Sequence, residues 1–169
     1  CIRDRMCIDN GHYHPTEVAG DKISAVLQYI DEVLLHVTRP VRWDSDHVVT
    51  LNEEIQLIAT EIVRNDFMSR VNVGLDFFDA SINRIGAYVT GTRAAQKAFL
   101  IAALEPTRTL ATIEEAGKYF ERLAMLEELK TMPFGAVWDY YCTKSNVPVG
   151  PAWLDEVKAY EKNVLSKRA

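Results

Sequence analysis

The feature that most constrains the fold of this chain is a change of hydrophobic pattern near residue 80. Before that point, short β-like runs alternate with amphipathic helical stretches. The expected strands are residues 5–9, 32–37 and 70–76. The expected helices between them are residues 16–29, with Thr16 as the N-cap, and a helix that begins at Asn52. This alternation with short connections predicts an α/β fold with a parallel sheet and right-handed crossovers.

From residue 80 onward the pattern is entirely helical. The expected helices are residues 82–89, 94–104, 109–129, 134–142 and 152–165. The breaks between them are expected at Gly91, Pro106, Pro133 and the 148–151 turn. We therefore predict two parts: an α/β unit over residues 1–80, and a helical C-terminal extension over 81–169. The extension has to bury its apolar faces on the α/β unit or on another subunit.

Composition excludes several classes of protein. With 19 basic and 24 acidic side chains the net charge is -5, which argues against a nucleic-acid binder. The longest strictly apolar run is residues 98–104, far shorter than the roughly 20 residues that span a bilayer, so no membrane partner is expected. The 3 cysteines lack C-x-x-C spacing, which disfavours a disulfide framework or thiolate zinc site and favours a reducing, cytoplasmic location. No phosphate-binding glycine loop and no G-x-S-x-G motif occurs.

Aspartate and histidine residues gather near the ends of the three expected strands. They are Asp9 and His12 after the first strand, His36, Asp44 and Asp46 at or after the second, and Asp76 at the third. In parallel α/β proteins, sites are built at the carboxyl ends of strands. Asp44 and Asp46 are two residues apart, so in extended backbone their carboxylates point to one side and repel unless a cation intervenes. Carboxylates mixed with imidazole predict a divalent metal: manganese, magnesium, cobalt or zinc.

Other interpretations of these residues stay open at this point. A single strand-end aspartate is often a helix cap or loop hydrogen-bonder, and His36, in an apolar run, could be a core histidine. The metal site is favoured because each of the three successive strands carries Asp or His at or near its C-terminal end. Three functions are then compatible with it: a metal-dependent sugar isomerase, a metal-dependent hydrolase or phosphodiesterase, and an inert oligomerisation fragment with vestigial ligands.

Three long segments carry a resemblance to a known family. They are DNGHYHP (9–15), RPVRWDSDH (39–47) and GLDFFDASINR (74–84), and the likeness continues through GTR (91–93), LEPT (104–107) and AYEK (159–162). These segments strongly resemble L-rhamnose isomerase. The likeness covers this whole chain but only about the last two-fifths of the family's length. Since the chain opens without an initiator Met, we expect it to begin inside a longer protein.

The resemblance implies a fold, a reaction and a set of ligands. The family is similar to xylose isomerase: a (β/α)8 TIM barrel with a helical extension, assembled as a homotetramer, with two divalent metals per site. The strands here would be the last three of the barrel. Asp9, His36 and Asp76 would bind the structural metal, and His12, Asp44 and Asp46 the catalytic one, normally manganese. The reaction interconverts L-rhamnose and L-rhamnulose. The family's remaining metal ligand, a glutamate, lies upstream, so the 169 residues alone are expected to be inactive.

Overall fold

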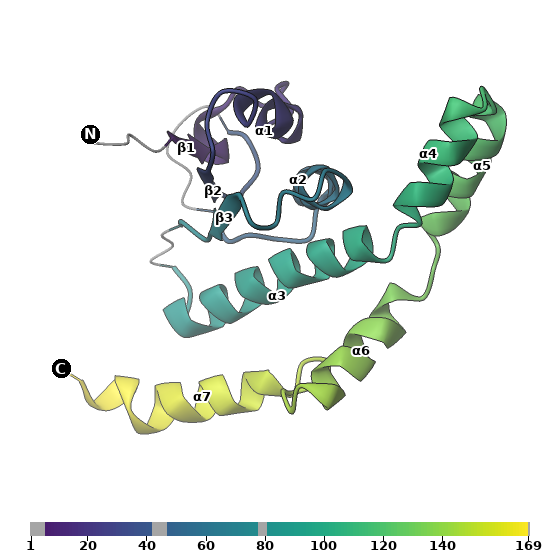
Figure 1. Ribbon diagram of the computed structural model, residues 1–169. Helices are drawn as coiled ribbons and strands as arrows, with labels where there is room; N and C mark the ends of the chain where they lie inside the picture. Colours follow the sequence, from purple (N-terminus) through teal and green to yellow (C-terminus); the bar gives the residue numbers. More distant parts are fainter. Residues whose placement is uncertain (1–5, 42–46, 78–80, 169) are drawn as a thin grey trace.

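The computed structural model describes residues 6–41, 47–77 and 81–168. Its three strands, β1 (Met6–Asp9), β2 (Val33–His36) and β3 (Val71–Gly74), form a parallel sheet in the order β1-β2-β3 (Figure 1). Asp9, His36 and Gly74 are level with one another in the register, at the carboxyl ends of the strands. Helices α1 (Gly20–Val26) and α2 (Glu53–Arg64) make the crossovers. The predicted α/β alternation with a parallel sheet is confirmed.

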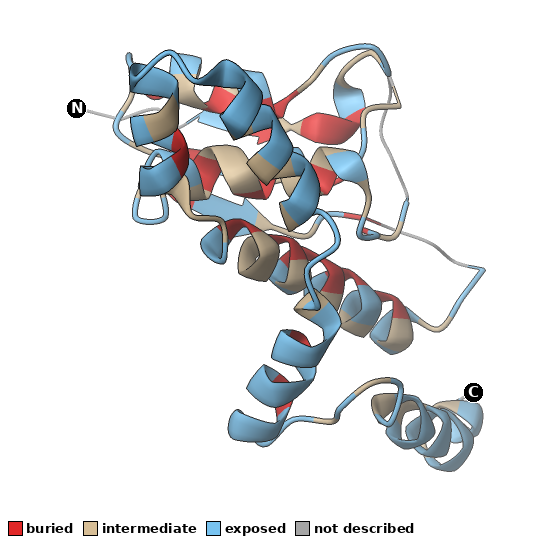
Figure 2. Ribbon diagram, turned by 90° about the vertical axis from the view of Figure 1, so that its right-hand side faces the viewer, coloured by how far each residue is buried: buried red, intermediate tan, exposed pale blue. Residues whose placement is uncertain are grey.

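In the part of the chain that the structure describes, helices cover one face of this sheet. Because side chains alternate along a strand, Ile8, Val33, Leu35 and Val71 point to the helical layer and are buried there. α2 packs against them with the four residues that share its predicted face: Ile55, Ile58, Ala59 and Ile62. Figure 2 shows the buried residues as red bands along the helices and strands. On the opposite face, the side chains of Cys7, Leu34 and Asn72 are exposed.

The first crossover helix is shorter than the sequence predicts. Thr16 was expected to cap a helix over 16–29, but α1 begins only at Gly20. The Thr16 hydroxyl instead lies 2.7 Å from Nδ1 of His14, and Glu17 donates its backbone N–H to the His14 carbonyl, which forms a turn. The prediction at α2 is confirmed, since the Asn52 side chain accepts from the N–H of Ile55 as an N-cap.

Helix α3 (Arg84–Ala103) is continuous, where the sequence predicted two helices separated at Gly91. Gly91 does not end the helix because it lies at a close contact with the core. A Cβ atom at Gly91 would be 3.3 Å from Cε1 of Phe77 and 3.4 Å from Cβ of Val49. The buried face of α3 is otherwise almost all alanine: Ala87, Ala94, Ala95, Ala98 and Ala102. These small residues let α3 lie close against α2 and the core.

The predicted helix over 109–129 is two helices, α4 (Thr107–Glu115) and α5 (Tyr119–Leu129). The chain turns at Gly117, whose φ of 71° is in the left-handed region that favours glycine. The N–H groups of Gly117 and Lys118 donate to the carbonyls of Glu114 and Ile113 and so close the end of α4. The resulting hairpin extends away from the sheet (Figure 1).

The last two helices, α6 (Phe134–Lys144) and α7 (Trp153–Asn163), return along α3. Arg93 of α3 holds the connection between them by donating to the carbonyls of Pro148 and Gly150, at 3.1 and 3.2 Å. Its guanidinium also lies over the ring of Trp138, 5.0 Å from the ring centroid. Two short 3-10 helices, η1 (Asn10–His12) and η2 (Leu165–Lys167), complete the fold.

Among the helices that the structure describes, none is long and apolar enough to cross a lipid bilayer.

Candidate metal centre

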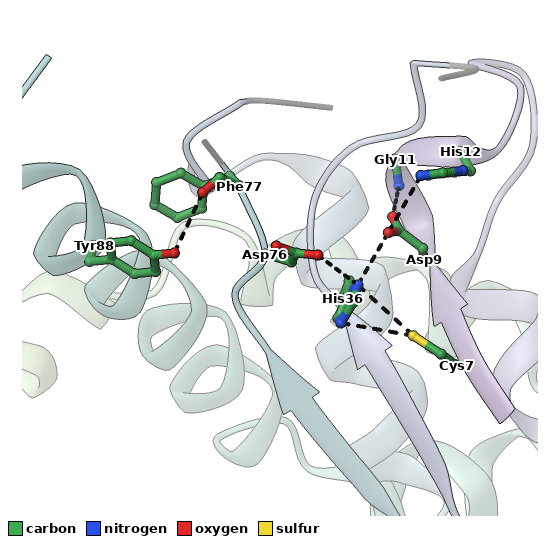
Figure 3. A network of polar contacts seen from close by, with 8 residues as sticks. All are labelled: Cys7, Asp9, Gly11, His12, His36, Asp76, Phe77 and Tyr88. Atoms are coloured by element: carbon green, nitrogen blue, oxygen red, sulfur yellow. Dashed lines mark hydrogen bonds and ion pairs between the residues drawn. The ribbon is translucent and has the colours of Figure 1, made fainter. Parts of the chain in front are cut away.

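Three predicted ligands meet at the carboxyl end of the sheet. Asp9 ends β1, His36 ends β2 and Asp76 follows two residues after β3. Nδ1 of His36 lies 3.1 Å from Oδ2 of Asp9 and 3.2 Å from Oδ2 of Asp76, so both carboxylates point at the same imidazole nitrogen (Figure 3). The parallel register explains this convergence, because it sets the ends of all three strands at one edge.

The spacing of these three groups suits a small divalent cation. One donor atom from each residue lies within 4.8 Å of the other two. Neighbouring ligands of an octahedral ion with bonds of about 2.1 Å are about 3.0 Å apart, close to the two measured distances. Oxygen and nitrogen donors are those that manganese, cobalt and zinc accept. Two carboxylates that face one point repel each other, and a bound cation would offset that repulsion.

The carboxylate of Asp9 is oriented by the turn that follows it. Its Oδ1 accepts a hydrogen bond of 3.0 Å from the N–H of Gly11, which leaves Oδ2 facing His36. The same Oδ2 lies 3.6 Å from Nε2 of His12 on η1. The Asp9-Asn10-Gly11-His12 segment thus places an imidazole and a carboxylate at one edge, as the sequence predicted.

Cys7 is a neighbour of the site that the sequence reasoning missed. Its Sγ lies 3.9 and 3.8 Å from the two ring nitrogens of His36. Partial burial and then the negative charges of Asp9 and Asp76 raise the pKa of the Cys7 thiol above its usual 9.0, so the thiol is the favoured form at neutral pH. Its place two residues before Asp9, hence on the same face of the strand, could have identified it.

The other three predicted ligands are not part of this cluster as the structure describes it. The His12 side chain is 57% exposed and lies beside the cluster of Asp9, His36 and Asp76, not within it. Asp44 and Asp46 lie outside the described residues, so their places as catalytic ligands stay predictions.

Comparison with known proteins gives one consistent result. A sequence model of the L-rhamnose isomerase family matches residues 2–168. The chain is 63% identical over 163 residues to an L-rhamnose isomerase of Mannheimia succiniciproducens. It is 60% identical over 163 residues to those of Enterobacter sp. strain 638 and Escherichia coli K12. Each match covers 96% of this chain but only 39% of the relative's own length.

Proposed function

Because this chain belongs to the L-rhamnose isomerase family, we propose that it is the C-terminal part of a metal-dependent enzyme that interconverts L-rhamnose and L-rhamnulose. The observation that carries the proposal is the convergence of Asp9, His36 and Asp76 on one point at the end of the sheet. A sugar is the small-molecule substrate in this proposal. The chain spans 39% of the length of these relatives, so the proposal concerns the whole protein.

We propose that the three strands are the last of a (β/α)8 TIM barrel. Three features support this: the strands are parallel and in sequential order, helices cover one face, and Cys7, Leu34 and Asn72 are exposed on the other. Parallel sheets are normally buried on both faces. In a barrel, the exposed face would turn inward and the two open edges would pair with further strands.

The proposed centre holds two divalent ions. Asp9, His36 and Asp76 would hold the structural ion, and His12, Asp44 and Asp46 the catalytic one, with manganese the expected metal and zinc, cobalt or magnesium able to substitute. When bound, the metals supply polarisation of the sugar carbonyl and stabilisation of negative charge on the sugar oxygens. Asp9 would present Oδ2 to the ion, because its Oδ1 accepts a hydrogen bond from the N–H of Gly11. Asp44 and Asp46 would hold a water molecule near the sugar, and this water would pass the proton between the two sugar oxygens.

We further propose a cytoplasmic homotetramer that forms through the helical extension. Support comes from α5, where every residue is at least partly exposed and Tyr119, Phe120 and Leu123 present large apolar side chains to solvent. Such a surface on a protruding hairpin is typical of a subunit contact.

Replacing Asp9 with Asn tests the proposal in the protein expressed at the length of its relatives. We expect the variant to lose one high-affinity Mn²⁺ in calorimetric titration and most of its conversion of L-rhamnose to L-rhamnulose, because Asn removes a charged ligand. Asp155→Asn, an exposed acid on α7, is the matched control and should change neither quantity. Unchanged metal affinity and turnover in Asp9→Asn would refute the proposal. Phosphate-ester hydrolysis without sugar turnover would favour a metal-dependent hydrolase instead.

A further inference from the structure

Asn10 is a buried polar residue that the proposed reaction does not use. It follows Asp9 directly and its relative exposure is 0%, whereas the nearby His12 is exposed. Its side-chain Nδ2 donates a hydrogen bond to the carbonyl of Thr38, two residues beyond His36. Thr38 is itself buried. The bond therefore joins the segments that follow β1 and β2, the two strands that deliver Asp9 and His36.

A second hydrogen bond fastens the same two segments. The N–H of Val41 donates to the carbonyl of Gly11 at 3.1 Å, so η1 is attached to the β2 exit at two points. Gly11 is also the residue whose N–H holds Oδ1 of Asp9. A shift of this turn relative to β2 would therefore move the Asp9 carboxylate away from Nδ1 of His36.

We propose that Asn10 is a positioning residue, which sets the distance between Asp9 and His36 by tying the turn after β1 to the segment after β2. This inference rests on the proposed function, since it assigns Asn10 to the same metal centre. Asn10 acts through the backbone of the turn, because its side-chain amide is bonded to the Thr38 carbonyl. Replacing a residue that orients the metal ligands without binding the metal typically changes metal affinity by about 10-fold to 100-fold.

The amide group of Asn10 can be replaced in two ways that test its hydrogen bond to the Thr38 carbonyl. The Thr38 carbonyl can only accept a hydrogen bond, so the amide must present its NH₂ group there. Oδ1 of Asn10 is buried and accepts no hydrogen bond from any residue that the structure describes. Asn10→Asp keeps the shape of the side chain but sets a carboxylate oxygen against the carbonyl. Asn10→Ala removes the bond without repulsion.

The test compares wild type, Asn10→Asp, Asn10→Ala and Ile62→Val in the protein expressed at the length of its relatives. Ile62 is a core residue of α2 and Ile62→Val serves as a control for a modest loss of packing. Calorimetric titration with Mn²⁺ gives the affinities, and the visible absorption of the Co²⁺-loaded protein reports ligand geometry. Hydrogen exchange at the Val41 amide reports the attachment of the turn without metal.

We expect Asn10→Asp to weaken the tighter Mn²⁺ site at least about tenfold, shift the Co²⁺ bands and speed exchange at Val41. Ile62→Val should leave the Mn²⁺ affinity, the Co²⁺ bands and the exchange rate at Val41 at their wild-type values. Mn²⁺ affinities of both Asn10 variants within twofold of wild type would overturn the inference. A loss of Mn²⁺ affinity in Ile62→Val as large as that in the Asn10 variants would also overturn it. If wild type binds no divalent ion, the proposed function fails, and unchanged Val41 exchange in Asn10→Asp would separately show that Asn10 does not hold the turn.

Discussion

At the scale of single residues, the ion pair of Glu17 and Lys22 connects the loop after η1 to α1. Nζ of Lys22 lies 2.8 Å from Oε2 of Glu17, and the ammonium group also lies over the ring of Tyr13. The hydrogen bond from Lys22, with a smaller contribution from the backbone N–H of His14, lowers the pKa of Glu17 below its usual 4.5. The pair is exposed, so its effect on stability is small.

This lowered pKa predicts a direction for the dependence of stability on pH. A carboxyl group with a lower pKa in the folded state adds stability above its unfolded pKa, and that stability disappears as pH falls through the folded pKa. Between about pH 6 and about pH 3 we expect the urea midpoint of wild type to fall slightly more than that of Lys22→Met. Parallel pH profiles for the two proteins would contradict the assignment. Lys167→Met, on η2, provides a control for the change of charge.

At the scale of the element, the turn at Gly117 is what makes α4 and α5 two helices. Its left-handed backbone costs a residue with a Cβ atom about 1–2 kcal/mol, and nothing lies within 4 Å of the Cβ position. We therefore expect Gly117→Ala to lower the free energy of unfolding by about 1 kcal/mol through backbone strain alone. Gly135→Ala is the control, since Gly135 is helical and equally uncrowded, and it should not destabilise. Equal effects of both substitutions in chemical denaturation would contradict this explanation.

The sequence predicted the alternation of strands and helices before residue 80 correctly, because hydrophobic periodicity reports burial within one element. It failed at local turns, where Thr16 and Gly117 shorten or divide a predicted helix, and at Gly91, where the outcome depends on another part of the chain. Gly91 was expected to end a helix, but its close contacts with Phe77 and Val49 exist only after α3 has docked. Asp9, His36 and Asp76 could be grouped in advance, because parallel topology alone brings strand ends together. Asn10 could not, since its burial depends on the path of the segment after β2.

At the scale of the whole molecule, the hairpin of α4 and α5 packs less against α3 than α6 and α7 do, in the part of the chain that the structure describes. Phe120 is 82% exposed. If this surface joins subunits, Phe120→Lys should weaken association at least about tenfold, the usual consequence of losing an aromatic at an interface. Light scattering coupled to size-exclusion chromatography measures the mass. Glu128→Gln makes the same change of net charge on the same helix and should leave the assembly intact. A Phe120→Lys variant with the wild-type mass at all concentrations would place the contact elsewhere.

The parallel order of the strands also has a consequence for how long the protein survives in a cell. Asp9, His36 and Asp76 are neighbours only when all three strands are in place. An ion held by them would therefore bind the folded chain and not the unfolded one. At a free concentration one hundred times its dissociation constant, such an ion adds about 2.7 kcal/mol to folding. Metal supply would then govern exposure of the chain to proteases. A cell starved of the metal would contain less of the protein, and not only a less active form of it.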